Sequence, residues 1–141
     1  MADYANRPGR LKRTLLVWLV LIVVEFLHGF LRTIFLVPVV GDFRSRQIGV
    51  FSGSVLIFIV VYLFIHWLDA SNTKALLQVG VLWVMLTVAF EFSFGHFVFG
   101  RSWADLASDY DLLHGGFLAL GMAVLAFSPL IAARLRRWDS L

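Results

Sequence analysis

Four long apolar stretches, separated by short polar segments, dominate the pattern of hydrophobic and polar positions along the chain. They cover residues 14–36, 48–68, 75–99 and 114–133. At about 1.5 Å per residue, a helix of about 20 residues crosses a hydrocarbon core of about 30 Å. No period-two alternation indicates strands, and a backbone exposed to lipid has to bond to itself. The pattern predicts four transmembrane helices.

The composition makes lipid the expected second solvent. Hydrophobic residues are 60% and charged residues 15% of the 141 residues, against about 45–50% and 25% in a soluble domain. We predict an all-α fold, a bundle of four transmembrane helices in one domain over residues 14–133. The first apolar run is too long for a signal peptide and no small-residue cleavage site follows it, so we expect a retained helix.

Cysteine is absent and the net charge is +3, which excludes disulfides and thiolate chemistry. The basic residues stand beside apolar runs, so the expected partner is the lipid bilayer and not nucleic acid. In a four-span arrangement, the larger group of basic residues lies on one side of the membrane: Arg7, Arg10, Lys12, Arg13, Lys74, Arg134, Arg136 and Arg137. The other side receives Arg32, Arg44, Arg46 and Arg101. The positive-inside rule places both termini, with basic segments at 1–13 and 134–141, in the cytoplasm.

The two halves of the chain look related at an offset of 66 residues. Helices one and three would then run in the same direction, and the repeat would be parallel. The alternative is chance similarity among apolar helices rich in Phe and Gly. The matching residues are Glu25 with Glu91, Phe26 with Phe92, Gly29 with Gly95, Gly49 with Gly115, and Phe51 with Phe117.

Ionisable residues inside the apolar stretches form the predicted intramembrane polar site. Glu25, His28 and Arg32 share one face of the first helix at spacings of three and four. Glu91 belongs to the outer half of the third helix, and His96 points about 140° away from it. The functional interpretation is a proton or cation site, and the structural one is internal neutralisation of Glu25 by its neighbours. We expect Glu25 to face the bundle interior and to form a hydrogen bond in its stripe or to helix three or four.

Metal and haem binding have weaker support. The Glu25-x-x-His28 spacing is half of a di-iron bundle motif, and no second Glu-x-x-His follows. A haem held by two histidines would need His28, His96 or His114 to face one another. We predict no metal and no cofactor.

A charge cluster is predicted at the outer surface. Arg44 and Arg46 are expected to pair with acids of the last outer loop or to bind lipid phosphate. Ser102 is expected to cap a short surface helix, and Asp109 or Asp111 to cap the fourth transmembrane helix. The cluster comprises Asp42, Arg44, Arg46, Gln47, Arg101, Asp105, Asp109 and Asp111.

Small residues indicate close helix packing. Gly49 and Gly53 are spaced by four on the second helix, and Gly115, Ala119 and Ala123 repeat that spacing on the fourth. Both faces are interpreted as internal contacts, with a seam between two copies of the chain as the alternative. Pro38 and Gly41 are expected to end the first helix.

Several segments resemble a group of small bacterial integral membrane proteins of about this length. They are Gly41-Asp42-x-Arg44-x-Arg46-Gln47-x-Gly49-x-Phe51-x-Gly53-Ser54, Glu91-Phe92-x-x-Gly95-His96, Gly100-x-Ser102-Trp103, and Asp109-Tyr110 with Gly115. The resemblance implies four membrane helices in a bacterial inner membrane, and it brings no known activity.

Two functional classes remain open. Small size and short loops favour a non-enzymatic accessory protein that packs against a larger membrane partner or forms a homo-oligomer. Glu25 and Glu91 favour a small transporter or a proton- or cation-coupled channel. A membrane redox protein that binds metal or haem is a distant third.

Overall fold

Residues 9–68, 70 and 72–139 are described by a computed structural model, and they form helices and connecting turns without strands. The elements are α2 (Arg10–Phe35), α3 (Val37–Val40), α4 (Asp42–Leu68), α5 (Thr73–Phe97), α6 (Trp103–Ser108), a 3₁₀ turn η1 (Leu112–His114) and α7 (Leu118–Asp139). Four of them, α2, α4, α5 and α7, are long and apolar enough to cross a membrane. The predicted all-α bundle of four long helices is confirmed.

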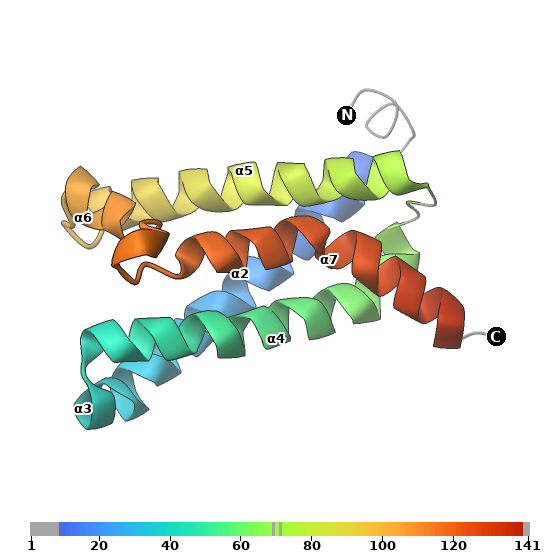
Figure 1. Ribbon diagram of the computed structural model, residues 1–141. Helices are drawn as coiled ribbons and strands as arrows, with labels where there is room; N and C mark the ends of the chain where they lie inside the picture. Colours follow the sequence, from blue (N-terminus) through green and yellow to red (C-terminus); the bar gives the residue numbers. More distant parts are fainter. Residues whose placement is uncertain (1–8, 69, 71, 140–141) are drawn as a thin grey trace.

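The beginning of α2 and the end of α7 lie at the same end of the bundle, and α3 and α6 lie at the other (Figure 1). We call these the inner and the outer end. α4 packs against α2 and α7, and α7 also packs against α5. Arg7 lies outside the described residues, as does the side chain of Arg137.

Two helix starts differ from the prediction. α4 begins at Asp42 instead of residue 48, so the outer arginines Arg44 and Arg46 stand on its first turns. The acidic Asp42 suits the positive end of the helix dipole there. α7 begins at Leu118 instead of residue 114, because Gly115 adopts a left-handed backbone with φ of 86°.

Of the two predicted helix caps, the cap of α6 is confirmed and the side-chain cap of α7 is not. The Asp105 N–H donates to the Ser102 hydroxyl at 3.0 Å, so Ser102 caps α6 as expected. The predicted cap of the fourth transmembrane helix is wrong, because Asp111 precedes η1 and the Asp109 carboxylate binds arginines. The first helix ends at Phe35, before Pro38, which occupies the first turn of α3, where its missing N–H costs no hydrogen bond.

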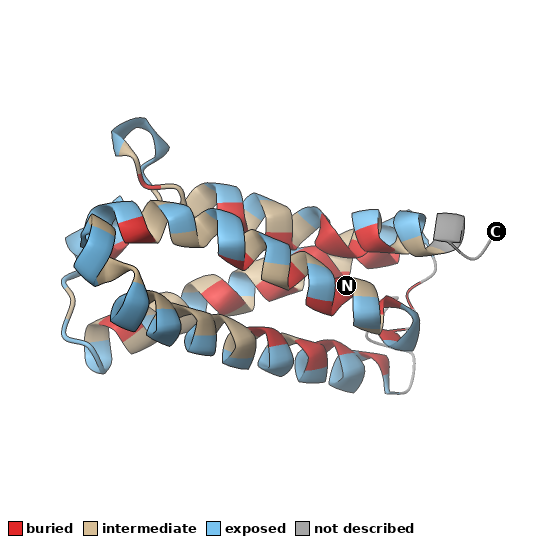
Figure 2. Cartoon of the chain, turned by 90° about the horizontal axis from the view of Figure 1, so that it is seen from below, coloured by how far each residue is buried: buried red, intermediate tan, exposed pale blue. Residues whose placement is uncertain are grey.

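An apolar core fills the inner half of the bundle (Figure 2). Its centre is Trp83 of α5, which is fully buried together with Val17 of α2 and Val61 of α4. The Trp83 indole N–H donates to the Thr14 carbonyl at 2.9 Å, so the ring joins α5 to α2 without an unpaired polar group. The other core residues include Leu21, Ile57, Val60, Ile65, Leu68, Ala75, Leu76, Val79, Leu125 and Ala132.

α5 and α7 approach each other closely at Gly80, where a Cβ atom would collide with the carbonyl oxygen of Ala126. The predicted small-residue face of the last helix is therefore wrong in part. Gly115 precedes α7, and Ala123 is exposed, whereas Ala119 is half-buried. A single glycine on the facing helix, not a repeated spacing on α7, allows the approach.

Substitution of Gly80 by Ala should lower the free energy of unfolding by about 1–3 kcal/mol, because a methyl group has no space against a backbone carbonyl. The matched control is Gly29→Ala in α2, where an added Cβ meets no atom within 4 Å. It should be neutral or stabilising by up to about 1 kcal/mol. Unfolding in mixed detergent, followed by circular dichroism, measures both. Equal stability of the two variants would contradict the packing described.

Candidate functional site

The outer half of the bundle contains two groups of interacting polar side chains, whereas the inner half contains the apolar core. The carboxyl cluster consists of Glu25, His28, Ser52, Glu91 and Tyr110, and the outer charge network consists of Asp42, Arg46, Arg101, Asp105 and Asp109.

The polar stripe of α2 lies against two glycines of α4. A Cβ on Gly53 would stand 2.7 Å from Glu25 Oε2, and one on Gly49 would stand 2.8 Å from Arg32 Cδ. The predicted Gly49 and Gly53 face is thus an internal contact, and it makes room for long polar side chains. This packing keeps Glu25 and Arg32 beside α4 in a layer where a charge facing lipid costs about 2.5–3.5 kcal/mol.

The members of the stripe have different partners. His28 Nδ1 lies 3.9 Å from Glu25 Oε2, which is too long for a hydrogen bond, and His28 Nε2 shares a 2.7 Å hydrogen bond with Ser52 Oγ. Arg32 donates to Ser45 Oγ at 2.6 Å and lies 4.0 Å from Asp42. Arg32 therefore belongs to the outer end, and the predicted neutralisation of Glu25 by Arg32 is not seen.

Glu25 is the unsatisfied group of the site. Its side chain is 32% exposed, but its Oε1 atom is buried and receives no hydrogen bond from the described residues. The hydrogen bond predicted between Glu25 and its own stripe, or the third or fourth long helix, is therefore not found among the described residues. A buried carboxylate oxygen without a donor is costly, and such groups in folded proteins call for an explanation.

Glu91 has a partner that the sequence did not indicate. The Tyr110 hydroxyl donates to Glu91 Oε2 at 2.9 Å, and the Tyr110 ring stacks on Phe92 with centroids 5.6 Å apart. Burial raises the pKa of Tyr110, and the Glu91 carboxylate raises it further, so the phenol remains a neutral donor. Tyr110 lies 19 residues from Glu91 in a connecting segment, and no periodic pattern could have linked them.

The two acids are neighbours across α2 and α5. Phe26, next to Glu25, meets Phe94 edge to face with centroids 6.3 Å apart, and Trp18 meets Phe90 in the same way at 6.2 Å. The Trp18 indole N–H also donates to the Thr87 hydroxyl at 3.0 Å. Trp18 shares a face of α2 with Glu25, seven residues on, and Thr87 shares a face of α5 with Glu91, four residues on, so the faces that carry the two acids adjoin. The carboxyl cluster thus unites Glu25, His28 and Glu91 of the predicted intramembrane site.

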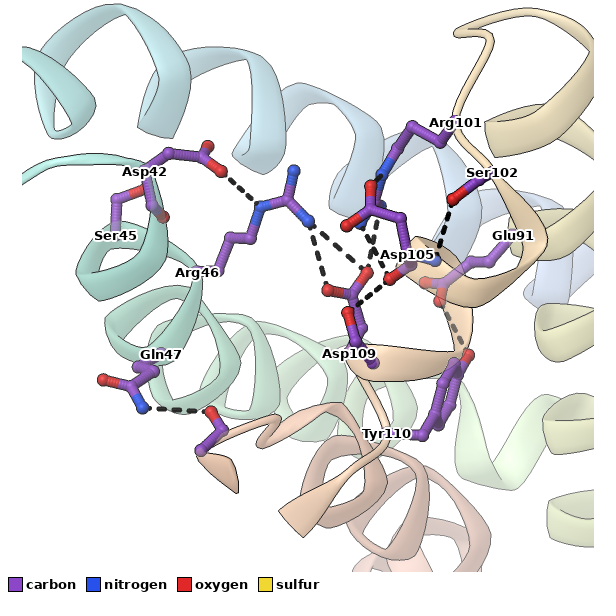
Figure 3. A network of polar contacts seen from close by, with 12 residues as sticks. Asp42, Ser45, Arg46, Gln47, Glu91, Arg101, Ser102, Asp105, Asp109 and Tyr110 are labelled. Atoms are coloured by element: carbon purple, nitrogen blue, oxygen red, sulfur yellow. Dashed lines mark hydrogen bonds and ion pairs between the residues drawn. The ribbon is translucent and has the colours of Figure 1, made fainter. Parts of the chain in front are cut away.

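The outer charge network is a row of alternating charges, shown in Figure 3. Asp109 is its centre, with Arg46 at 3.1 Å and Arg101 at 2.9 Å. Asp42 extends the row at 2.9 Å from Arg46 Nε, an ion pair without hydrogen-bond alignment, and Asp105 ends it at 2.7 Å from Arg101. The row connects α4 to the segments on both sides of α6.

The pairing of Arg101 with Asp105 shifts the pKa values of both groups. The hydrogen bond from Arg101 lowers the pKa of Asp105. Burial alone would lower the pKa of Arg101, but its hydrogen bonds to Asp105 and Asp109 outweigh that effect and raise it. Arg101 and Asp105 therefore both keep their charges at neutral pH.

The pairing predicted for the outer arginines is confirmed for Arg46 and wrong for Arg44. Arg44 is exposed and forms no ion pair with a described residue. Gln47 donates to the Gly115 carbonyl at 3.0 Å, and Asp111 pairs with exposed His114 at 2.7 Å.

His96 does not join the carboxyl cluster. Its Nδ1 shares a 2.8 Å hydrogen bond with the Arg101 carbonyl, and its ring stacks on Trp103 with centroids 3.8 Å apart. His28, His96 and His114 have separate surroundings, so no pair of them faces a common haem position. In the part of the chain that the structure describes, no three His, Asp or Glu side chains converge as metal ligands do.

The arrangement suits reversible binding of a proton by two carboxyl groups beside a neutral phenol. Comparison with models of protein families, with curated proteins and with solved structures gives no match to this chain.

Replacement of Asp109 by Asn should lower the free energy of unfolding by about 1–3 kcal/mol, because two arginines lose their shared carboxylate. Asp111→Asn is the control, since Asp111 pairs only with exposed His114 among the described residues. That change should stay within about 0.5 kcal/mol. Denaturation in detergent measures both, and a loss of the same size at the two positions would argue against the central role of Asp109.

Proposed function

We propose that this chain is a non-enzymatic accessory protein of a bacterial inner membrane that docks against a larger membrane protein through its outer end. The observation that carries the proposal is the location of the most exposed apolar side chains. Leu113, Val39, Phe97 and Phe35 are 94%, 77%, 76% and 69% exposed, more than any other large hydrophobic residue described. All four belong to the outer connections or to the helix ends that border them.

The chemistry of these positions favours a protein partner over lipid. Lipid tails cover apolar side chains on the spans, and Trp and Tyr are the residues enriched at the headgroup level. Leu113 instead stands in a turn between Asp111 and His114, whose side chains contact each other at 2.7 Å, and Val39 stands in the four-residue α3. Exposed aliphatic side chains at the same end as the outer charge network resemble the apolar core of a protein interface with its polar rim.

Transport has less support from the same geometry. Glu25 and Glu91 belong to the outer half, and inward of them the bundle is closed by Leu21, Val61 and Trp83, which are 3%, 0% and 0% exposed. A proton crossing the protein would need a continuous line of polar groups or water in that half, where the Trp18 indole binds the Thr87 hydroxyl and the Trp83 indole binds the Thr14 carbonyl. The internal repeat adds little to either proposal, because Gly49 lies within α4 while its counterpart Gly115 lies in a turn.

Docking can be tested in cells of the native host with a photo-crosslinking amino acid at Phe99, close to the outer connections. Leu63 on the inner half of α4 is the matched control, because both side chains are 63% exposed. We expect adducts with a larger protein from position 99 and lipid adducts only from position 63. Lipid adducts alone at both positions, or an adduct of two copies of this chain, would contradict the proposal.

The proposed orientation has the inner end, with both termini, in the cytoplasm, from the excess of basic residues there. Because the chain has no cysteine, variants with a single introduced cysteine report the orientation directly. An impermeant maleimide should label Arg44→Cys in intact spheroplasts and Lys12→Cys only after lysis, since the two residues are exposed at opposite ends. Labelling of Lys12→Cys before lysis would reverse the orientation.

A further inference from the structure

We infer that Glu25 and Glu91 form a proton-binding site that exchanges with the outer compartment only, with the proton on Glu25 and the negative charge on Glu91. This inference is independent of docking at the outer end. It rests on the contacts of the carboxyl cluster and on the closed inner half of the bundle.

The cations near the two acids have other partners. On α2, Arg32 binds Ser45 and approaches Asp42, and on α4, Arg46 pairs with Asp42 and Asp109. Beyond α5, Arg101 pairs with Asp105 and Asp109.

Among the described residues, the ionisable group that remains beside Glu25 is His28. Its Nδ1 lies 3.9 Å from Glu25 Oε2, too far for a hydrogen bond, and its Nε2 shares a hydrogen bond with Ser52 Oγ. Two unneutralised carboxylates in an apolar layer repel each other, and one bound proton removes that repulsion.

The hydrogen-bond donors assign the proton to Glu25. Tyr110 donates to Glu91 Oε2 and remains protonated, which favours the charged form of Glu91. Glu25 Oε1 is buried and receives no donor from the described residues, which favours the neutral form of Glu25. In this state a single negative charge remains on the pair, at the position where a phenol stabilises it.

Linked polar contacts run from the pair to the outer end. From Glu91 they continue to Tyr110 and to the adjacent residue Asp109, which belongs to the outer charge network. Toward the inner end, the next polar contact is the hydrogen bond from the Trp18 indole N–H to the Thr87 hydroxyl at 3.0 Å. Apolar Leu21, one turn before Glu25, and the wholly buried Trp83, two turns before Glu91, stand beside that contact and continue into the apolar core. The proton therefore enters and leaves at the outer end, and the charge of the outer half follows the acidity of the outer compartment.

Infrared spectroscopy of the full chain in proteoliposomes tests this directly, through the carbonyl stretch of a protonated carboxyl group. With the protein inserted in one orientation, we expect this band to disappear when the buffer on the outer side is made alkaline. Alkalinisation on the inner side alone should leave it unchanged. Glu25→Gln should abolish the band, and Glu91→Gln should weaken proton binding about tenfold, because it removes the neighbouring charge.

A variant that changes no ionisable group distinguishes proton binding at Glu25 from a purely structural role of that residue. Gly53→Ala places a methyl group against Glu25 Oε2, so it should displace the carboxyl group and change the pH dependence of the band. Gly29→Ala, in open space on α2, should leave that dependence unchanged. A band that survives Glu25→Gln, that follows the inner pH, or that is unaffected by Glu91→Gln in the folded protein would overturn the inference.

Discussion

Burial of the α2 polar stripe is the constraint on which the outer half of the bundle depends. Glu25, His28 and Arg32 recur on one face, and that face cannot be left to lipid without a large cost. Gly49 and Gly53 of α4 solve the problem by providing space for side chains instead of close backbone contact. A pair of small residues that usually brings two helices together here makes room for long polar side chains.

The two halves of the bundle are held by different forces. In the inner half, apolar contacts around Trp83 and the close approach at Gly80 join α5 to α2 and α7. In the outer half, ion pairs converge on Asp109 and connect α4 with the segments around α6. Lipid offers little hydrophobic drive between spans, so packing and polar contacts have to supply the association. The division leaves one end closed and apolar and the other charged.

Both proposals concern this charged end. The exposed apolar side chains Leu113 and Val39 lie in the outer connections, and Glu91 reaches the same region through Tyr110. A change of charge on the carboxyl cluster would therefore be felt close to the proposed docking surface. Tyr110 adjoins Asp109, so one short segment contacts the acid pair and the ionic frame together.

The amino-acid sequence by itself determined the four apolar spans and the all-α class, because length and hydropathy act locally. The sign of the charges indicated that outer arginines could meet acids of the last loop, but only the structure selected Arg46 and Asp109. Only the tertiary structure decided that Tyr110 binds Glu91, that Gly80 meets Ala126, and that Glu25 keeps a buried oxygen without a donor. It also gave His96 its partners, the Arg101 carbonyl and Trp103, and moved Gly115 out of the last helix. These features depend on the rotation and height of helices relative to one another, which side-chain packing between distant segments sets and no periodicity along one segment records.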